Sequence, residues 1–390
     1  MKKSLLFVMD SLGIGGGEKS LVTLLSLIDY TKYDVDLQLF SNDGEFVQFL
    51  PKEVKLLPLL PYNRFLNNGL IKSLFSFKLS YIKTRIKYSY KIHRYKLTHA
   101  AKAMTYWQTC SSCYNSTKHY DIAIAYSQGL PTFYVIDKVN AEKKIGWVNV
   151  DYKMDNRLKT FTNEYYNEIN HIVTVSDNTH KYFEGLFPQF KDKIHTIYDI
   201  INDKLIHSMS MNGGLFTYDT VFSIVTLARL NHQKGFDISL NACKILKSRG
   251  YKFQWHVFGN GPERGNMLSF IKENELDNFF IIHQPVANPY PFLANATIYV
   301  QTSRNEGYGI SIAEARILNK PVVTTEYTAV WSQMVQGKNG IVVPIDATAV
   351  ADAIEDLILH PEKREAISAY QRTEKKGNTE EIEKFYKLLE

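Results

Sequence analysis

The chain has 390 residues, of which 45% are hydrophobic and 22% charged, the proportions of a globular rather than a disordered protein. This length favours two domains over one core, and no apolar run reaches the roughly 18 residues that a membrane-spanning helix needs. The early apolar run is interrupted by Asp10, so we interpret it as a first strand rather than a signal peptide. Three cysteines are too few for a disulfide framework, and we expect a cytoplasmic protein.

The net charge of +6 is unevenly distributed along the chain. Between Glu53 and Asp121 there is no acidic residue, whereas Lys and Arg together number twelve. Aromatic and aliphatic residues are interleaved with these cations at about 64–102, on a largely helical pattern. Such a segment suits an anionic membrane surface, where each cation contributes about 1 kcal/mol. We expect peripheral association with the inner face of the cell membrane and no nucleic-acid partner; a solvated basic face is the alternative.

Short apolar segments alternate with helical patterns along the whole chain, which predicts an α/β protein with parallel sheets. The polar segment 208–219, SMSMNGGLFTYD, is typical of an interdomain connection. We predict two doubly wound, Rossmann-like domains at 1–205 and 219–360, facing each other across a cleft, and a helical segment at 361–390. Ligands of such domains bind at the carboxyl ends of the strands. Strands are expected at 4–10, 33–40, 54–59, 120–127, 143–150 and 171–176, and then at 222–230, 254–260, 279–284, 297–303 and 321–326.

A glycine-rich segment, GIGGGEKS at 13–20, follows the first expected strand. The dinucleotide fingerprint fails because Glu18 stands where the third glycine belongs, and the P-loop fails because Gly17 is followed by Glu-Lys-Ser. What remains is a glycine turn that opens a helix, whose N–H groups can face an anion or a ligand hydroxyl. An ordinary tight turn is the alternative.

Two cations and two carboxylates follow strands of the second domain. Arg229 lies at the end of the strand expected at 222–230 and Lys234 lies in the loop after it; together they can neutralise a diphosphate. Glu306 lies in the loop after the strand at 297–303, and Glu314 lies eight residues later in the next helix. Carboxylates accept hydrogen bonds from sugar hydroxyls, and a helix N-terminus offers donors to phosphate. The pattern favours a nucleotide sugar; solvated surface charges are the alternative.

The string EGYGISIAEA at 306–315 resembles the E-x7-E signature of retaining family 4 glycosyltransferases of the GT-B fold. The resemblance continues through LARLNHQKGF, HVFGNGPER, NPYPFLANATIYVQTSRNEG, KPVVTT and GKNGIVV, and covers most of residues 220–360. In the first half only GGGEKS and the GWVNVDY region are similar. The implied fold is GT-B, with an acceptor-binding first domain and a nucleotide-sugar-binding second domain.

The resemblance also implies roles for particular residues. Arg229 and Lys234 would hold the donor diphosphate, Glu306 would contact the donor sugar, and Glu314 would bind the ribose. The catalytic residues would be Arg229, Lys234 and Glu306. Further positions would surround the donor: Gly15, Gly16, Gly259, Gly261, Gly307, Tyr308, Gly309, Ile310 and Asn149.

The chain departs from this family at two positions. Where relatives often have W-x-H-x-D, it has Trp-Val-Asn-Val-Asp at 147–151, so Asn149 replaces a histidine. An amide cannot transfer a proton as an imidazole can. Gln284 also stands where a glycine is usual.

These observations lead to one expectation and one rival. We expect a metal-independent, retaining glycosyltransferase that uses a nucleotide-sugar donor, UDP-sugar above others, and no further cofactor. Its acceptor would be a lipid-linked saccharide in surface-polysaccharide or glycolipid synthesis. The rival is a non-catalytic, glycosyltransferase-like subunit that binds membrane or a sister enzyme. Asp34 and Asp36 form a D-x-D, but they lie within an expected strand, so no metal site is expected.

Overall fold

The structure is a computed structural model that describes residues 2–41, 44–67, 79–95, 97–149, 154–212, 222–306 and 308–390. Contacts divide the chain into two compact units. The N-terminal unit comprises residues 1–200 and 380–390, and the C-terminal unit comprises residues 201–379. The chain therefore passes from one unit to the other twice, after Ile200 and after Thr379.

The N-terminal unit is built on a parallel sheet in the order β3-β2-β1-β4-β5-β6-β7. Alternate residues of β1 face opposite layers: Leu5 and Phe7 pack in one hydrophobic cluster, and Leu6 and Val8 in another. The strands are β1 (Lys3–Met9), β2 (Tyr33–Leu39), β3 (Lys55–Leu56), β4 (His119–Ala125), β5 (Asn140–Val148), β6 (His171–Thr174) and β7 (Ile194–Thr196).

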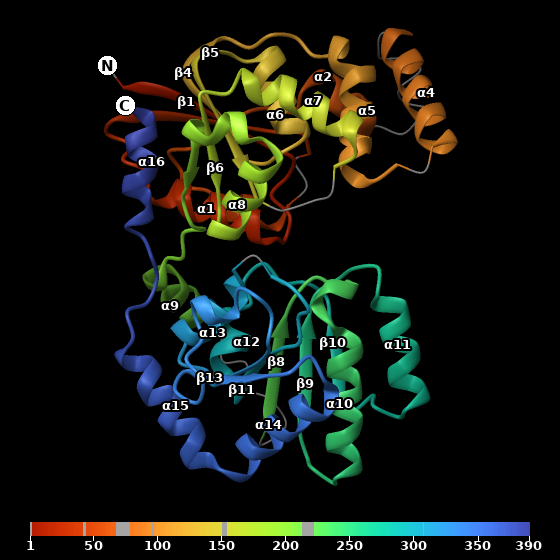
Figure 1. Ribbon diagram of the computed structural model, residues 1–390, viewed down its shortest axis with the longest axis vertical. Coiled ribbons are helices and arrows are strands. Elements are labelled where there is room, and N and C mark those ends of the chain that lie inside the picture. Colours follow the sequence, from red (N-terminus) through yellow and green to blue (C-terminus); the bar gives the residue numbers. More distant parts are fainter. Residues whose placement is uncertain are drawn as a thin grey trace. The chain divides into compact units, whose positions relative to one another are not determined.

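The helices of this unit lie on both faces of the sheet (Figure 1). Helix α1 follows β1, and the basic region contributes α2, α4 and α5. The helices are α1 (Gly16–Leu27), α2 (Pro61–Asn67), α4 (Leu79–Arg94), α5 (His99–Cys110), α6 (Leu130–Lys138), α7 (Asn156–Asn167), α8 (Asp177–Leu186) and α16 (Glu381–Leu389).

The C-terminal unit has a parallel sheet in the order β10-β9-β8-β11-β12-β13. The strands are β8 (Ser223–Leu227), β9 (Gln254–Phe258), β10 (Phe280–His283), β11 (Ile298–Gln301), β12 (Val322–Thr325) and β13 (Gly340–Val343). Helices α10 and α14 pack together on one face, whereas α9, α12 and α13 share a hydrophobic cluster on the other. The helices are α9 (Asp203–Met211), α10 (Phe236–Ser248), α11 (Arg264–Glu273), α12 (Tyr290–Asn295), α13 (Ile310–Ile317), α14 (Ala347–Leu359) and α15 (Pro361–Thr373).

The observed domain limits differ from the predicted limits of 205, 219 and 361. Helix α9 packs on α12 and α13, so it belongs to the C-terminal unit, although it begins before the predicted connection at 208–219 and overlaps its first residues. The predicted terminal helical segment is two helices that belong to different units: α15 lies in the C-terminal unit and α16 in the N-terminal unit. Part of the predicted connection, residues 213–219, lies outside the described residues.

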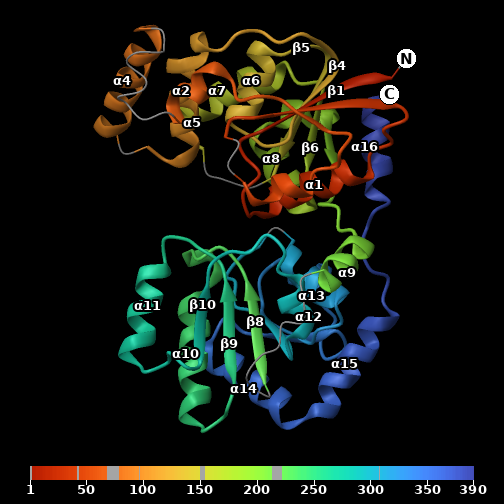
Figure 2. The ribbon, with the colours of Figure 1, turned by 180° about the vertical axis from the view of Figure 1, so that it is seen from behind.

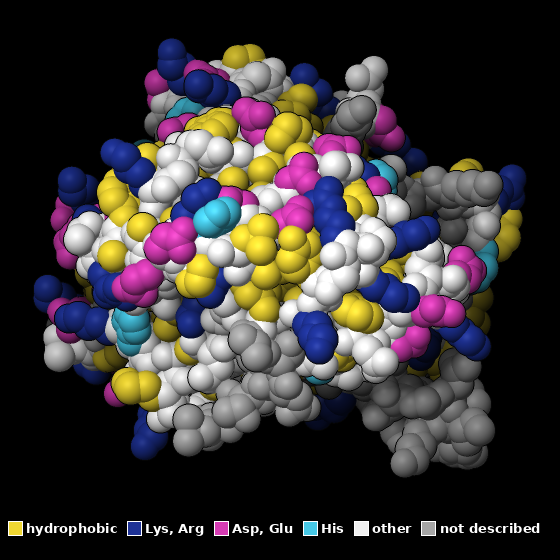
Figure 3. All heavy atoms as spheres, turned by 90° about the horizontal axis from the view of Figure 1, so that it is seen from below, with side chains coloured by type: hydrophobic (Ala, Val, Ile, Leu, Met, Phe, Trp, Pro, Cys, Tyr) yellow, Lys and Arg dark blue, Asp and Glu magenta, His cyan; other side chains and the backbone are white. Residues whose placement is uncertain are grey.

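Opposite charges are paired on the helices that cover one end of the C-terminal unit. Arg249 lies 2.7 Å from Asp352, and Lys363 lies 2.6 Å from Asp356. Figure 3 looks onto the molecule from below, and on that face basic and acidic side chains are interspersed while hydrophobic ones gather near the middle. This face therefore presents mixed charge rather than a field of one sign.

Helix α16 completes the core of the N-terminal unit, and Figure 2 shows it beside β1. Its Phe385 is fully buried, with ring centroids 6.0 Å from Phe7 and 5.9 Å from Trp147. Lys3 Nζ donates to the Leu389 carbonyl at 2.7 Å, and Lys143 Nζ donates to the Leu388 carbonyl at 3.0 Å. Cations at a helix C-terminus interact favourably with the helix dipole.

We predict that Phe385→Ala lowers the free energy of unfolding by about 3–5 kcal/mol, because it removes a fully buried ring from a packed core. Urea unfolding of the full chain measures this loss. Lys387→Ala alters an exposed residue of the same helix and should cost less than about 0.5 kcal/mol. Equal stabilities of the two variants would show that α16 is not part of the core.

Candidate functional site

The candidate site of the C-terminal unit is built on the loops after β8 and β11. A short 3-10 turn, His232–Lys234, follows β8, and the Asn231 side chain caps it by accepting the Lys234 N–H at 3.2 Å. Arg229 is exposed at the start of this loop. Adjacent parallel strands end at the same edge of a sheet, so the loop after β11 lies next to it.

Gly235 fixes the close approach of these two loops. Its φ is +64°, in the left-handed region, and a Cβ atom here would lie 2.0 Å from the Thr302 carbonyl oxygen. The Thr302 hydroxyl donates to the Gly235 carbonyl at 2.9 Å. Only glycine fits this position without displacing the loop after β11.

Lys234 and Glu306 meet at this contact. Lys234 Nζ lies 2.5 Å from Glu306 Oε1, with 21% and 11% of the two side chains exposed. The same carboxylate oxygen accepts from Ser303 Oγ at 2.7 Å and Gln301 Nε2 at 2.9 Å. Three donors therefore converge on one oxygen of a carboxylate that is largely withdrawn from solvent. Two predicted site residues are thus directly bonded.

A second ion pair, between Arg304 and Asp237, joins the loop after β11 to the start of α10. The Arg304 guanidinium donates two hydrogen bonds to the Asp237 carboxylate, at 2.8 and 2.6 Å. These bonds hold the pKa of Asp237 below its ordinary value. Because Asp237 is in the first turn of α10 and Arg304 is next to Ser303, the pair joins the helix to the Glu306 loop.

The N-terminus of α13 is shaped by Gly309 and Gln333. Gly309 has a φ of +89°, and a Cβ here would lie 2.6 Å from Tyr327 Oη. Gln333 Nε2 donates to the carbonyls of Tyr308, at 2.5 Å, and Gly309, at 3.2 Å. The helix begins at Ile310, and its first N–H groups provide a natural site for an anion. Gly307, also predicted here, lies outside the described residues.

Glu314 is buried on α13, with 1% of the residue exposed. Its Oε1 accepts from the Tyr290 hydroxyl, on α12, at 2.9 Å. Burial and the neighbouring carboxylate raise the pKa of Tyr290, so the hydroxyl stays a donor. The contact with Tyr290 was not predicted, because no motif links these two positions.

Gly259 and Gly261 have a packing role that needs no ligand. A Cβ at Gly259 would lie 1.9 Å from the Ala228 carbonyl oxygen, and one at Gly261 would lie 2.3 Å from that of Leu230. The loops after β8 and β9 are joined there by the Leu230 N–H, which donates to the Asn260 carbonyl at 2.9 Å. Contact of either glycine with a nucleotide stays a prediction.

In the N-terminal unit, the predicted positions surround the start of α1. Gly15 caps the helix and Gly16 is its first residue. Asn149 Nδ2 donates to the Tyr126 carbonyl at 2.8 Å, and its amide lies 3.4 Å from where a Cβ of Gly17 would be. Asn149 is therefore held next to the glycine turn of this unit.

Beneath α1 lies a polar cluster that sequence reasoning missed. Ser20 Oγ and the buried Tyr126 hydroxyl are 3.0 Å apart. Burial raises the pKa of Asp199 to about 6, although a hydrogen bond with Ser20 opposes the shift. These residues are far apart in sequence and match no motif, so only the fold reveals the cluster.

Asp34 and Asp36 have partners of their own. Lys2 Nζ lies 3.4 Å from Asp34, and Asp36 accepts from Tyr120 at 2.8 Å and pairs with Lys118 at 2.9 Å. Among the described residues, no group of three or more His, Cys, Asp and Glu side chains could hold a metal ion.

Residues 215–374 match the model of the family described as glycosyl transferases group 1. This part of the chain is therefore a group 1 glycosyl transferase domain, in agreement with the resemblance found in the sequence.

Two curated relatives each match less than half of this chain. The chain is 31% identical over 179 residues to the capsular polysaccharide biosynthesis glycosyltransferase CapM of Staphylococcus aureus, covering 42% of this chain and 46% of that protein. It is 28% identical over 163 residues to the putative colanic acid biosynthesis glycosyltransferase WcaL of Salmonella typhimurium, covering 37% and 40%. The chain thus spans less than half of the length of these relatives.

Solved structures resemble the whole chain. The TM-score is 0.66 with TarM, at 14% identity and with 100% of this chain and 99% of TarM covered. It is 0.68 with Alr3699/HepE of Anabaena in complex with UDP and glucose, at 16% identity and 99% and 98% coverage. These likenesses confirm the predicted α/β fold of GT-B type.

We predict that Gly235→Ala destabilises the protein more than Gly250→Ala does. Gly250 also has a positive φ, of +84°, but open space around its Cβ position, so alanine there should cost only about 1–2 kcal/mol. At Gly235 the added methyl group also meets the Thr302 carbonyl. Urea unfolding compares the two variants, and equal losses would contradict the tight contact.

Proposed function

We propose that this protein is a retaining glycosyltransferase that uses a UDP-sugar and no metal ion, and that its acceptor is a lipid-linked saccharide of surface-polysaccharide synthesis. The observation that carries this proposal is the Lys234–Glu306 pair, which joins a cation to a hydroxyl-accepting carboxylate close to the start of α13. A nucleotide sugar needs both kinds of group. The similarity to CapM, a capsular polysaccharide biosynthesis glycosyltransferase, supports the choice of pathway. The similarity to HepE, whose structure contains UDP and glucose, supports the choice of donor.

The leaving group would be stabilised by fixed charges. As the bond between the anomeric carbon and the phosphate oxygen breaks, negative charge develops on the diphosphate. Lys234 has three N–H donors, so it can contact a phosphate oxygen while it remains bonded to Glu306. The exposed Arg229 and the N–H groups of α13 would add to this stabilisation.

A front-face displacement suits these residues better than a covalent intermediate. Glu306 Oε1 already accepts from Lys234, Gln301 and Ser303, which makes that oxygen a weak nucleophile. Asn149 is an amide and cannot accept the proton of the acceptor. The acceptor hydroxyl would attack the face from which the diphosphate leaves and pass its proton to a phosphate oxygen, so the anomeric configuration is retained.

We predict that UDP, rather than GDP or ADP, raises the unfolding temperature, both with magnesium and with EDTA. At 100 times its dissociation constant a ligand stabilises the native state by about 2.7 kcal/mol. The Lys234→Ala/Arg229→Ala variant should lose the shift. The control variant Lys363→Ala removes an exposed lysine of α15 that pairs with Asp356, and this variant should keep the shift.

The result also separates the proposal from its rival. No shift with any of the three nucleotides would favour a non-catalytic subunit. A shift that EDTA abolishes would contradict metal-independent binding. If UDP binds, NMR of the product formed from a UDP-α-sugar gives the anomeric configuration, and a β-linked product would exclude retention.

We further propose that α4 contacts an anionic lipid surface. Tyr81 is buried, whereas the opposite stripe is exposed and alternates apolar and basic side chains: Leu79, Lys83, Ile86, Lys87, Tyr90 and Arg94. Leu79 and Ile86 are 76% and 65% exposed. Among the described residues, no helix is long and apolar enough to cross a bilayer. Residues 68–78 and 96 of the predicted basic segment lie outside the described residues.

We predict that the protein sediments with phosphatidylglycerol vesicles and not with phosphatidylcholine vesicles, and that added salt weakens this binding. Lys83→Glu/Lys87→Glu should lower the partition constant by at least about 30-fold, since each lysine near the surface contributes about 1 kcal/mol. Lys363→Glu/Lys387→Glu makes the same change in net charge on other exposed helices and should bind like the wild type. Equal weakening would mean that net charge, rather than α4, determines binding.

A further inference from the structure

One tryptophan of the C-terminal unit is open to solvent. The chain has four tryptophans, and three of them, Trp107, Trp147 and Trp255, are at most 1% exposed. Trp331 lies in a short 3-10 turn after β12, Val330–Ser332, and is 49% exposed. Single exposed apolar residues are common, so exposure alone indicates no site. The fixed position of this ring and the side chains around it carry the inference.

The Trp331 ring is held in place by a carboxylate. Its Nε1 donates to Glu326 Oε1 at 3.2 Å. Glu326 directly follows β12, and its backbone N–H donates to the Val343 carbonyl, at the end of β13, at 2.7 Å. The indole has no other hydrogen-bonding group. What Trp331 can offer to a ligand is therefore the π surface of a ring whose polar edge is already bonded.

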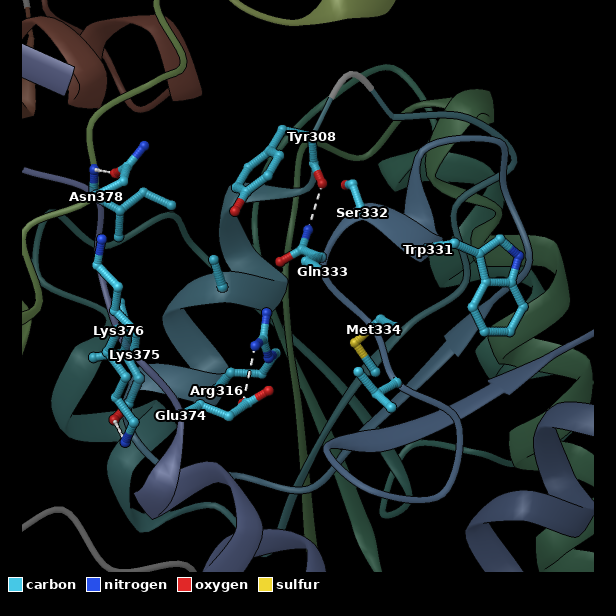
Figure 4. A pocket seen from close by; sticks show the side chains of 15 residues that line it. Tyr308, Arg316, Trp331, Ser332, Gln333, Met334, Glu374, Lys375, Lys376 and Asn378 are labelled. Carbon is cyan, nitrogen blue, oxygen red and sulfur yellow. Dashed lines mark hydrogen bonds and ion pairs between the residues drawn. The ribbon is translucent and has the colours of Figure 1, made fainter. Parts of the chain in front are cut away.

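The loop after β12 divides its side chains between two environments. Tyr327 and Gln333 are 3% and 6% exposed and reach the start of α13, where Gln333 Nε2 donates to the Gly309 carbonyl at 3.2 Å. Figure 4, a view of the pocket between this loop and α13, shows the Trp331 ring directed away from Tyr308 and Gln333. Trp331 is therefore separate from the candidate donor site.

The exposed neighbours of Trp331 in the loop are polar. They are Glu326, Thr328 and Ser332. Ser332 Oγ donates to a backbone carbonyl at 2.7 Å, so its oxygen can still accept a hydrogen bond. Lys338 Nζ lies over the Tyr370 ring, 5.9 Å from its centroid. The charge next to the indole is thus the negative charge of Glu326, which disfavours a phosphate or an anionic lipid headgroup.

We propose that Trp331 is the stacking platform of a surface site for a neutral saccharide. One face of a pyranose carries C–H groups, whose partly positive hydrogens are attracted to the negative face of an indole. The hydroxyls at the edge of the sugar would donate to Glu326 and Ser332, which both accept. An open site of this kind suits a unit within an oligosaccharide. The proposal does not rest on the transferase activity, because it uses no residue of the candidate donor site.

Acrylamide quenching of tryptophan fluorescence tests the site in the full chain, because Trp331 is the one tryptophan that a quencher in solvent reaches. The probes are cellotetraose, maltotetraose and chitotetraose. We expect at least one of them to lower the quenching constant, with saturation, toward the value of Trp331→Ala. The same oligosaccharide should give a saturation-transfer difference NMR signal that Trp331→Ala loses. Leu268→Ala truncates a side chain of α11 that is 48% exposed and should retain the signal.

A second variant determines the class of ligand. Glu326→Gln keeps an oxygen for the indole N–H and for sugar hydroxyls but removes the charge, so it should retain saccharide binding, and choline should not compete. The site is overturned if no tetrasaccharide protects Trp331, or if the NMR signal survives in Trp331→Ala that circular dichroism shows to be folded. It is also overturned if choline displaces the saccharide, or if only phosphatidylglycerol vesicles protect Trp331. Binding of UDP is measured on the same samples, so failure of the donor site is recognised separately.

Discussion

The site of the C-terminal unit depends on the ion pair between Lys234 and Glu306. Both side chains are largely withdrawn from solvent, so removing either one would leave the other as an uncompensated charge. The pair can form only because Gly235 lets the two loops touch. Gln301 and Ser303 also donate hydrogen bonds to the Glu306 carboxylate. These contacts join the loops after β8 and β11 into one structural element.

Much of the architecture was predictable because each element carries its own local signal. Apolar strands alternate with amphipathic helices, and every strand expected from the sequence overlaps an observed one. The short strands β7 and β13 were not predicted, although other strands of four residues were. The division into units was also only partly predictable, because α9 and α16 are assigned by tertiary packing rather than by local sequence.

The residues of the candidate site were predicted from the sequence, and their role stays a prediction; their contacts with one another were not predicted. Motif spacing identified Lys234 and Glu306 yet could not show that they bind each other, because 72 positions separate them. The roles of Tyr290 and Gln333 were missed for the same reason: each acts through one hydrogen bond to a distant segment. At Gly259 and Gly261 close backbone packing is itself a reason for glycine, whether or not either residue contacts a nucleotide.

The return of the chain to its first unit has a consequence for how the protein folds during synthesis. Domains usually fold in order as they leave the ribosome, the N-terminal one first. Here the core around Phe7 and Trp147 is closed by Phe385, a residue translated only after all of the C-terminal unit. The first unit must therefore remain open on one side while the second is made. That exposed apolar strip is a natural place for a chaperone to bind the nascent chain.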